Sequence, residues 1–437
     1  MKKTIYLLTG AAGFLGSNIS RTLISQGKKV RALVLPNDPA MPQVPAEVDI
    51  VSGNLLDINS LKRFFTIGYD TEIIVIHCAS MVTVKDGYNK KLYDINVHGT
   101  RNIIDKCLEH KVKKLVYVSS TSAIPELPHG QTIKEIDYYD HNAVVGFYGK
   151  TKAEASQAVM DAVKYAGLDA SIIFPSGICG PNDYAYGYYS NAIMDIVAEK
   201  MPAGIAGSFN AVDVRDLAEG IAACAEKGGK GEGYILSNDI VTIDDIFELV
   251  TKYTGAKRVT TILSLSAAKG IAYFSEVYGK LTHTETALTS FAVYNLARNN
   301  TFSSKKAREE LGYKTRTFDE TIRDTIIWLD AEGKLQLKED SLIKKVIENL
   351  KESTKNIHDT NKKVYELRKK HFKERHTKAV SNEPGIFEKV KNASGFGNKF
   401  KTFFIGIHEA AQENVQNEKR RRAEIREAVK NGKKKKE

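Results

Sequence analysis

Tyr148 and Lys152 are the two residues whose types and spacing most directly indicate chemistry. They stand in the run Tyr-Gly-Lys-Thr-Lys, and four residues apart on a helix they share one face. A phenol with a reference pKa of about 10 is a poor acid or base at neutral pH. A nearby ammonium favours the phenolate, so Tyr148 is predicted to exchange a proton with a substrate oxygen. Lys150, two residues from Tyr148, faces elsewhere.

A glycine-rich run, TGAAGFLG at Thr9 to Gly16, lies far upstream of this pair. Gly10, Gly13 and Gly16 follow a short apolar strand and open a helix. Such glycines allow a tight turn, a close approach of the backbone to a pyrophosphate, and tight packing of helix on strand. The run predicts a nicotinamide-dinucleotide site, in which Lys152 also bonds the nicotinamide ribose while hydride moves to or from the ring.

A cluster of hydroxyl residues ends the predicted buried strand 114–118, where ligands gather in parallel sheets. The cluster is Ser119, Ser120, Thr121 and Ser122. Some of these residues are expected only to cap or turn the chain. Thr121 is the predicted third catalytic residue, which positions the substrate carbonyl, and Ser120 is the second candidate.

The end of the second predicted strand selects between NAD and NADP in such sites. The segment reads VRALVLPND, with no acid at Val34 or Leu35. Arg31 comes early enough to point elsewhere, and Asp38 comes late. The sequence leaves both cofactors open. A carboxylate at this position would repel the 2′-phosphate of NADP. Its absence therefore favours NADP.

Strands and helices alternate through the first half of the chain. Strands are predicted at 4–9, 30–35, 72–77, 114–118 and 171–174, and helices at 16–26, 93–110 and from Tyr148 to about Tyr165. This order predicts an α/β fold, a Rossmann-type doubly wound parallel sheet. From about Pro175 the pattern changes to a tyrosine- and glycine-rich loop and then to helices with short strands. Residues 175–333 are therefore predicted to form a smaller, substrate-binding region.

The net charge of +11 is unevenly distributed. Residues 1–330 contain 36 Lys and Arg against 37 Asp and Glu, whereas residues 331–437 contain 28 against 16. The basic excess thus belongs to the tail. We expect an enzyme domain at 1–333 and a basic, mainly helical and partly disordered extension at 334–437.

Three interpretations of the tail remain open. Seven-residue repeats of apolar residues (Ile343, Leu350, Ile357, Val364) give a weak coiled-coil signal or a helix packed on the enzyme. The stretch from Phe396 to Ile407 is amphipathic and suits an anionic membrane surface. Basic clusters at 419–422 and 433–436 suit phosphates, but no folded nucleic-acid motif accompanies them, so nucleic acid ranks last. A solvated extension with no partner is the plain alternative.

The four cysteines are scattered, and the ten histidines show no ligand spacing. Free thiols in a reducing compartment are therefore expected, and no metal is predicted. No signal-peptide pattern and no apolar run of about 18 residues is present. The predicted location is cytoplasmic, with peripheral contact at the inner membrane face if the tail binds lipid. The predicted partners are a small-molecule substrate and a second copy of the chain in a homodimer.

Several ordered segments give the chain a family resemblance over about residues 3–333. They are TGAAGFLG, GNLLD (53–57), IHCAS (76–80), NVHGT (96–100), YVSSTSA (117–123), YGKTK (148–152), FPSGICGP (174–181), DVRDLAEGI (213–221) and SSKKAREELGY (303–313). The chain resembles the extended short-chain dehydrogenase/reductases, the NAD(P)-dependent epimerase/dehydratase group. It is most similar to the dihydroflavonol-reductase-like and 3β-hydroxysteroid-dehydrogenase-like branch.

The resemblance implies roles for individual residues. It identifies Thr121, Tyr148 and Lys152 as the catalytic set. The residues implied to contact the dinucleotide are Gly10, Gly13, Phe14, Leu15, Gly16, Asn54, Leu55, Ala79, Ser80, Lys152, Pro175 and Ile178. Two positions depart from the family pattern. Asn54 stands where an Asp is usual, and Phe174 stands where sugar-nucleotide epimerases often carry an Arg.

Three functions follow as hypotheses. The first is a reductase or dehydrogenase that interconverts a ketone and a secondary alcohol on a bulky, fairly apolar molecule, such as a steroid, flavonoid or lipid. The second is a sugar-nucleotide epimerase or dehydratase, which Phe174 disfavours. The third is a cofactor-binding scaffold with a membrane-associating tail, against which the intact Tyr148/Lys152 pair argues.

Overall fold

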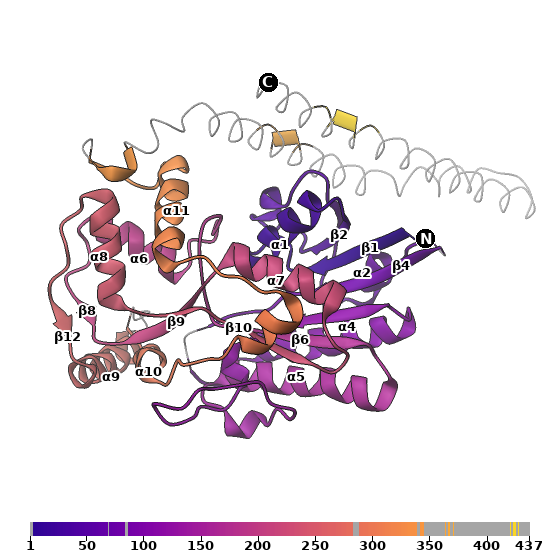
Figure 1. The fold of residues 1–437 in the computed structure, drawn as a ribbon, viewed down its shortest axis with the longest axis horizontal. Helices are drawn as coiled ribbons and strands as arrows, with labels where there is room; N and C mark the ends of the chain where they lie inside the picture. Colours follow the sequence, from indigo (N-terminus) through magenta and orange to yellow (C-terminus); the bar gives the residue numbers. More distant parts are fainter. Residues whose placement is uncertain are drawn as a thin grey trace, which may run out of the picture. The chain divides into compact units, whose positions relative to one another are not determined.

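Seven parallel strands form the central sheet of the protein (Figure 1). From one edge to the other they are β10 (Gly233–Leu236), β6 (Ala170–Pro175), β5 (Lys114–Val118), β4 (Thr71–His77), β1 (Lys3–Thr9), β2 (Lys29–Val34) and β3 (Asp49–Ser52). The strand order reverses next to β1, between β1 and β4. Ligands bind at such a switch point, beyond the carboxyl ends of the strands. The predicted doubly wound sheet is confirmed.

The computed structural model describes residues 3–68, 70–83, 86–282, 288–338 and 341–344, with single residues at 363, 366, 367, 370, 420, 423, 424 and 427. The chain divides into two compact units, Met1–Asn349 and Leu350–Glu437. Most residues of the predicted heptad repeat, and all of the Phe396–Ile407 stretch, lie outside the described residues. The interpretations of the tail therefore stay predictions.

Helices cover both faces of the sheet because its strands are apolar on both sides. Helices α1 (Phe14–Ser25) and α7 (Val214–Lys227) pack on one face, against a core that includes Tyr6 and Leu8. Helices α2 (Ile58–Phe65), α4 (Gly99–Glu109) and α5 (Phe147–Ala166) pack on the other, against a core that includes Leu7. Alternate residues of β1 thus face opposite cores, as the two-residue period of a strand requires.

The helix predicted at 93–110 is interrupted. A short helix α3 (Lys90–Tyr93) runs into a π-helical turn, η2 (Asp94–His98), and only then into α4. One extra residue in a turn changes which side chains face inward. The wider turn presents Asn96, which is buried, to the loop that follows β4.

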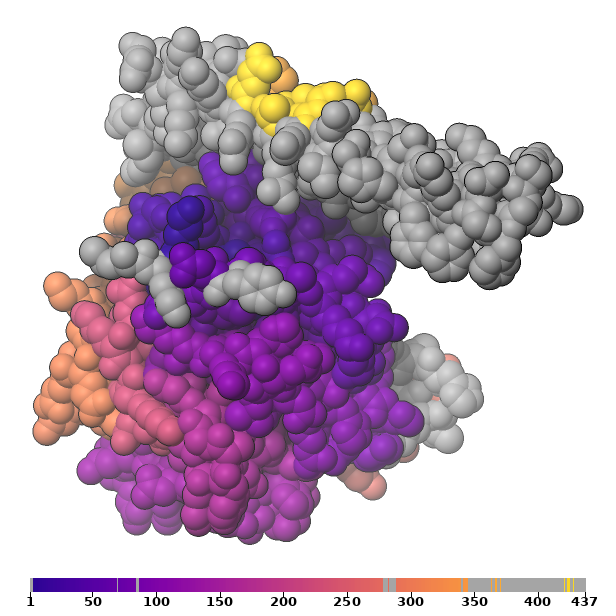
Figure 2. Space-filling view, turned by 90° about the vertical axis from the view of Figure 1, so that its right-hand side faces the viewer, coloured from indigo at the N-terminus to yellow at the C-terminus, as the bar shows by residue number. Residues whose placement is uncertain are grey.

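A second layer follows residue 175. It contains a three-stranded sheet of β7 (Gly177–Cys179), β9 (Ser208–Asp213) and β11 (Asp239–Thr242), and a pair of β8 (Gly204–Ile205) and β12 (Ile262–Leu263). Its helices are α6 (Tyr188–Val197), α8 (Ile243–Thr254), α9 (Leu265–Thr282), α10 (Ser290–Ala297) and α11 (Phe318–Ala331). In Figure 2 its pink and orange residues lie beside the indigo and purple residues of the sheet region.

Packing of this layer continues past residue 333, where the sequence predicts the end of the enzyme domain. Leu335 and Ile343 are buried in the same apolar cluster as Phe247, Ile326 and Leu329. The first compact unit accordingly extends to Asn349. The assignment of function to the two parts stays a prediction.

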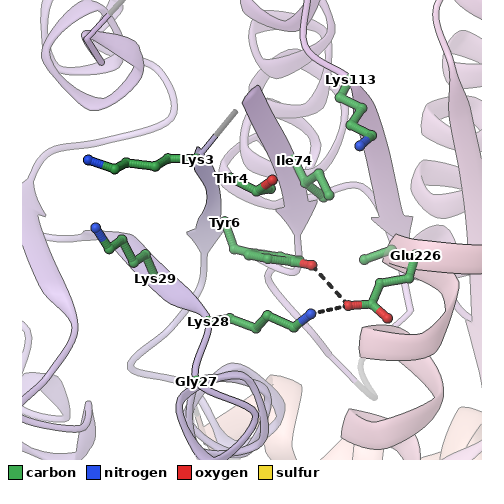
Figure 3. Close-up of a pocket in the computed structure, with 10 residues that line it drawn as sticks. Lys3, Thr4, Tyr6, Gly27, Lys28, Lys29, Ile74, Lys113 and Glu226 are labelled. Carbon is green, nitrogen blue, oxygen red and sulfur yellow. Dashed lines mark hydrogen bonds and ion pairs between the residues drawn. The ribbon is translucent and has the colours of Figure 1, made fainter. Parts of the chain in front are cut away.

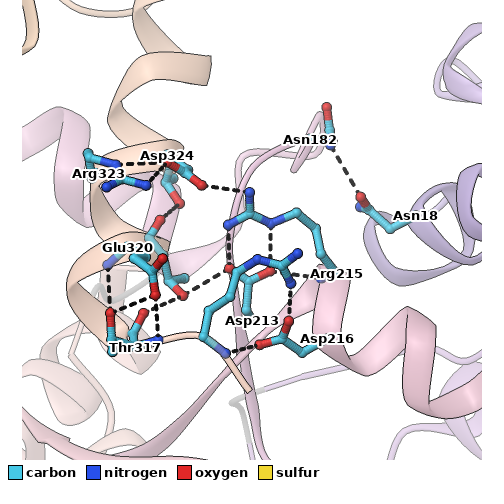
Figure 4. Close-up of polar contacts among 12 residues, drawn as sticks. Asn18, Asn182, Asp213, Arg215, Asp216, Thr317, Glu320, Arg323 and Asp324 are labelled. Carbon is cyan, nitrogen blue, oxygen red and sulfur yellow. Dashed lines mark hydrogen bonds and ion pairs between the residues drawn. The ribbon is translucent and has the colours of Figure 1, made fainter. Parts of the chain in front are cut away.

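A buried ionic network joins α7 to α11 (Figure 4). Asp213 caps α7. Its carboxylate accepts hydrogen bonds from Nη2 of Arg215 at 2.7 Å and from the Thr321 hydroxyl at 2.9 Å. Arg215 also donates to Asp324 on α11 at 2.6 Å. Together these bonds satisfy a charged aspartate that is only 2% exposed, which would otherwise be strongly destabilising.

Candidate active site

The glycine-rich turn connects β1 to α1 at the carboxyl end of the sheet. Gly10 has a φ of 75°, and a Cβ there would lie 2.7 Å from the Ala79 nitrogen. A Cβ on Gly16 would lie 2.0 Å from the Gly10 carbonyl oxygen, so α1 packs on this turn only if residue 16 is glycine. Gly13 caps α1 and has no side chain to bond its first amides. The cradle therefore fits a pyrophosphate on the amides of Phe14 and Leu15.

Asn54 and Leu55 follow β3, where the adenine is predicted. The Asn54 side-chain oxygen accepts a hydrogen bond from the Leu56 amide at 3.0 Å, and Ser60 holds the Asn54 amide at 2.9 Å. The Asn102 side chain donates to the Leu55 carbonyl at 2.9 Å. The Asn54 oxygen is thus engaged within its own turn, and the segment has a fixed conformation.

Ala79 and Ser80 follow β4 and lie beside the glycine turn. The Ala79 amide donates to the Thr9 hydroxyl at 3.2 Å. The Ser80 hydroxyl donates to the Asn96 side-chain oxygen at 3.1 Å, and the Met81 amide donates to the same oxygen at 2.8 Å. The structure therefore brings both residues to the switch point of the sheet, next to Gly10.

Asn96 is the polar centre of this region. Besides accepting those two bonds, its amide nitrogen donates to the Met81 carbonyl at 3.0 Å and to the Thr151 hydroxyl at 3.1 Å. All four hydrogen-bonding positions of the side chain are used, which fixes the orientation of the amide. No role for Asn96 was predicted from the sequence. The segment NVHGT was its only signal, and the π-helical turn that presents it has no recognised sequence pattern.

Tyr148 lies in the first turn of α5, close to the end of β5. A Cβ on Gly149 would lie 2.7 Å from the Ser122 carbonyl oxygen, so glycine after the tyrosine lets α5 approach this segment. Desolvation raises the pKa of the Tyr148 phenol to about 12, while hydrogen bonds from the Ser120 and Ser80 side chains act to lower it. The hydroxyls that the structure brings to the phenol are thus those of Ser120 and Ser80.

Thr121, the predicted third catalytic residue, is buried in the turn η3 (Thr121–Ala123). Ser120 caps that turn by accepting a hydrogen bond from the Ser122 amide at 3.2 Å. Of the two candidates, the second one, Ser120, acts on the phenol by lowering its pKa. The catalytic role of Thr121 stays a prediction, and the geometry gives it no contact with Tyr148 among the described interactions.

Lys152 is only 2% exposed and lies one turn further along α5. Its ammonium donates to the Val118 carbonyl at 2.7 Å and lies 4.8 Å from the centre of the Tyr117 ring. Desolvation lowers its pKa to about 7. Among the described residues, Ser120 and Ser80 act to lower the Tyr148 pKa, and the predicted effect of Lys152 on the phenol stays a prediction. Lys150 is exposed, as expected.

Pro175 ends β6 and Ile178 lies in β7, so both stand near the carboxyl ends of β5 and β6. Between them, the Ser176 hydroxyl is buried and has no hydrogen-bond partner among the described residues. A buried polar atom without a partner is unusual in a folded protein. Its position on the predicted nicotinamide side fits a group supplied by a bound dinucleotide.

The residues at the end of β2 bear on the choice of cofactor. Arg31 donates to Asp49 at 2.9 Å and to the Thr66 carbonyl at 2.8 Å, so it points away from the site, as expected. Asp38 accepts a hydrogen bond from the Ala40 amide at 2.9 Å within its own turn. Leu35 is exposed. Neither a free carboxylate nor a free guanidinium stands at this strand end in the described part of the chain.

A separate hollow of about 410 Å³ opens at the amino ends of β1, β2 and β4 (Figure 3). Three of its charged side chains are engaged in ion pairs: Lys28 bonds Glu226, which also accepts from the Tyr6 hydroxyl at 3.3 Å, and Lys113 bonds Glu72 at 2.8 Å. Ligands of parallel sheets bind at the opposite ends of the strands. We therefore do not assign this hollow to the active site.

Within the described residues, no group of His, Cys, Asp and Glu side chains has the arrangement of a metal site. None of the described helices is both long enough and apolar enough to cross a membrane.

Comparison with known proteins identifies the family. Residues 6–237 match the model of the NAD dependent epimerase/dehydratase family, which is more than half of the chain. The chain belongs to this family, and the predicted NAD(P)-dependent enzyme class is confirmed.

Individual relatives agree with this placement. The chain is 27% identical over 335 residues to sterol demethylase protein B of Methylococcus capsulatus, covering 75% of this chain and 98% of that one. It is 26% identical over 332 residues to a putative dihydroflavonol 4-reductase of Synechocystis, covering 75% and 95%. A crystal structure of gox2253 superposes with a TM-score of 0.66 at 30% identity, covering 76% of this chain and 99% of that one.

Proposed function

We propose that this protein interconverts a ketone and a secondary alcohol on a bulky, fairly apolar small molecule, with Tyr148 as the acid and base. One observation carries the proposal. The Tyr148 phenol stands at the carboxyl end of the sheet beside the Ser120 and Ser80 hydroxyls, which act to lower its pKa, and Lys152 lies one turn away on the same helix. The glycine turn lies at the same end, so a dinucleotide bound there would supply or accept the hydride.

The environment of Tyr148 suits proton donation to a ketone oxygen. Desolvation keeps the phenol protonated at neutral pH, since it raises the pKa to about 12. As the proton leaves, the Ser120 hydroxyl can donate to the developing phenolate and stabilise it, whereas the Ser80 hydrogen is already donated to Asn96. Lys152 has a pKa of about 7, so its charged form is available near neutrality without leaving the buried site.

The chemistry of the substrate is inferred from the relatives and from Phe174. One relative is named for a sterol and another for a dihydroflavonol, both ring systems of low polarity. Phe174 is fully buried and stacks on Tyr139 with ring centres 5.3 Å apart. At this position sugar-nucleotide epimerases often carry an Arg, whereas here the side chain is an apolar part of the core. The difference favours a substrate without a diphosphate.

We infer a preference for NADP over NAD. The one carboxylate near the end of β2, Asp38, is bonded to its own turn and would repel a 2′-phosphate less than a carboxylate facing the ribose. Comparison of kcat/KM for NADPH and NADH measures the preference directly. A higher value for NADH contradicts it.

The central experiment follows oxidation of NADH and NADPH by the purified full-length chain against a panel of ketosteroids, flavonoid-like ketones and nucleotide sugars. Net consumption of the reduced cofactor with a ketone supports the proposal. Turnover of a nucleotide sugar with the cofactor retained would instead identify an epimerase or dehydratase. We expect Tyr148→Phe to lower kcat by at least about 100-fold, with NADPH affinity within about threefold of wild type. Undiminished activity would refute the proposed proton transfer.

We also propose that the basic tail contacts an anionic membrane surface, which rests on its amphipathic stretch and its excess of cations. Co-sedimentation of the full chain with vesicles containing phosphatidylserine, compared with neutral vesicles and with residues 1–349 alone, tests this. Equal binding by residues 1–349 would assign the contact to the enzyme part instead.

A further inference from the structure

His77 is the last residue of β4 and is fully buried beneath the candidate active site. Its two ring nitrogens reach two different elements. Nδ1 lies 2.7 Å from the Thr9 hydroxyl, at the end of β1, and Nε2 lies 3.0 Å from the Thr100 hydroxyl, on α4. The proton transfer proposed above does not use this imidazole. Its contacts nevertheless join β4 and β1, the two strands that flank the switch point, to α4.

The neighbouring bonds determine which nitrogen carries the proton. Thr100 donates its only hydroxyl hydrogen to the Asn96 carbonyl at 2.6 Å, so its oxygen must accept from Nε2. The Thr9 oxygen accepts from the Ala79 amide at 3.2 Å, which leaves its hydrogen free to donate to Nδ1. Nδ1 thus accepts from Thr9 and Nε2 donates to Thr100, so His77 is neutral and protonated on Nε2.

Burial and charge both oppose a second proton. Desolvation, followed by repulsion from Lys152, lowers the pKa of His77 to about 3. The ring also stacks on Tyr117, with centres 5.6 Å apart. A proton on Nδ1 would place two donors face to face at Thr9. The neutral form is therefore the working form across the ordinary pH range.

The ends of this chain of bonds lie next to the groups that matter. Thr9 directly precedes Gly10, and it holds Ala79. At the other end, the Asn96 side chain accepts from Ser80 and donates to Thr151, and Ser80 is one of the two hydroxyls that act on the pKa of the Tyr148 phenol. We propose that His77 is a positioning residue: as the neutral Nε2–H tautomer it fixes the cofactor loop through Thr9 and the proton-transfer site through Thr100. The second half of this inference rests on the proposed function.

The tautomer is tested without any turnover. Imidazole ¹⁵N chemical shifts of the full chain, labelled on histidine, distinguish the two neutral tautomers and the cation. The His77 signals are assigned by their loss in His77→Gln. We expect Nε2 protonated and Nδ1 bare, unchanged from about pH 5 to about pH 8. A proton on Nδ1, or titration within this range, would overturn the inference.

Two variants separate the two halves of the role. In His77→Asn the side-chain oxygen lies near the position of Nδ1 and can accept from Thr9. In His77→Gln the amide nitrogen reaches the position of Nε2 and can donate to Thr100. Each variant thus retains one bond and loses the other, and about 1 kcal/mol per lost bond corresponds to about fivefold.

We expect His77→Asn to retain NADPH affinity and lose about fivefold in kcat, and His77→Gln to show the reverse. NADPH affinity is measured by its fluorescence on binding, which does not depend on the substrate. Parallel losses in both quantities, or a loss of melting temperature alone, would reduce His77 to an ordinary core residue. If no substrate turns over, the tautomer and the binding split still decide the Thr9 half.

Discussion

At the residue scale, the site combines a protonated phenol with a lysine whose pKa lies near neutral pH. Burial raises the pKa of Tyr148 to about 12 and lowers that of Lys152 to about 7. Both shifts have the same origin, because a poorly solvated site disfavours the charged form of either group. Such shifts concentrate at functional sites. The stability of the protein should therefore reflect the cost of keeping Lys152 buried.

We predict that Ser120→Ala lowers kcat by about 100-fold, because it removes a donor to the phenol where charge develops. Thr121→Val, which keeps the shape of threonine, should change kcat by less than about threefold. Ser120 also caps η3, so its replacement costs about 1 kcal/mol of stability. Steady-state kinetics, checked against chemical denaturation, separates the two effects. A larger loss in Thr121→Val would restore Thr121 as the catalytic hydroxyl.

We predict that Lys152→Met abolishes turnover yet stabilises the cofactor-free protein at low pH. The folded pKa is about 7 and the ordinary value 10.5, so between these values the unfolded chain binds more protons. The free energy of unfolding of the wild type therefore rises with pH over this window. Below it, the full cost of burying the charge is present.

The variant removes that cost but leaves the Val118 carbonyl without its donor. We expect a net gain of roughly 1–3 kcal/mol near pH 6, which disappears towards pH 10. Urea denaturation at several pH values measures it, with Lys150→Met, an exposed position on the same helix, as the matched control. A gain that does not depend on pH would show that desolvation of Lys152 is not its cause.

The residue types were predictable from the sequence, but their contacts were not. Tyr148 and Lys152 share a helix, so their common face follows from a fixed period. The hydroxyl cluster lies beyond the end of β5, where the chain leaves the strand and enters η3 at Thr121. A two-residue alternation therefore cannot be continued past Val118, and the sequence alone does not choose between Ser120 and Thr121.

At the element scale, the site depends on how closely helices approach the strand ends. The first turn of α1 rests on the Gly10 carbonyl, and α5 rests on Ser122. The alternation of apolar strands and helices was enough to predict the doubly wound class and five strands of the central sheet, but not the edge strands β3 and β10. The sequence did not predict the break between α3 and α4, because a π-helical turn has the same apolar spacing as an imperfect helix.

We predict that Gly16→Ala costs about 1–3 kcal/mol of stability and lowers NADPH affinity at least about tenfold. The new methyl group would lie 2.0 Å from the Gly10 carbonyl oxygen, so α1 must move away from the turn. Gly270→Ala, in α9, is the control, because no atom lies within 4 Å of its new methyl group. That variant should be neutral or stabilise by up to about 1 kcal/mol. Equal behaviour of the two variants would contradict the close-packing argument.

At the scale of the whole molecule, the chain divides into two compact units, Met1–Asn349 and Leu350–Glu437. The charge distribution predicts a separate basic part, since all of the positive excess follows residue 330. It could not locate the packing boundary, because Leu335 and Ile343 lie in a charged, helix-prone stretch and yet are buried. The seven-residue repeat that includes Ile343 does not say whether that side chain packs on the enzyme or on another helix.

We predict that a chain ending at residue 349 is as stable as the full chain and turns over at the same rate. A chain ending at residue 333 should lose roughly 2–5 kcal/mol, because it removes Leu335 and Ile343 from the core. Replacing both by Ala within residues 1–349 should reproduce most of that loss. Thermal and urea unfolding provide the measurement. Equal stability of the two shorter chains would place the boundary back at residue 333.

The core that Leu335 and Ile343 complete also contains Trp328, the single tryptophan of the chain. Its indole contacts Tyr184 and Tyr186, with ring centres 5.3 and 5.9 Å apart, and both tyrosines lie on the loop that follows β7. Fluorescence excited at the long-wavelength edge of protein absorption, where tryptophan absorbs and tyrosine does not, therefore comes from Trp328 alone. It makes α11 and this loop an internal optical reporter, able to register their rearrangement separately from the sheet that holds the dinucleotide.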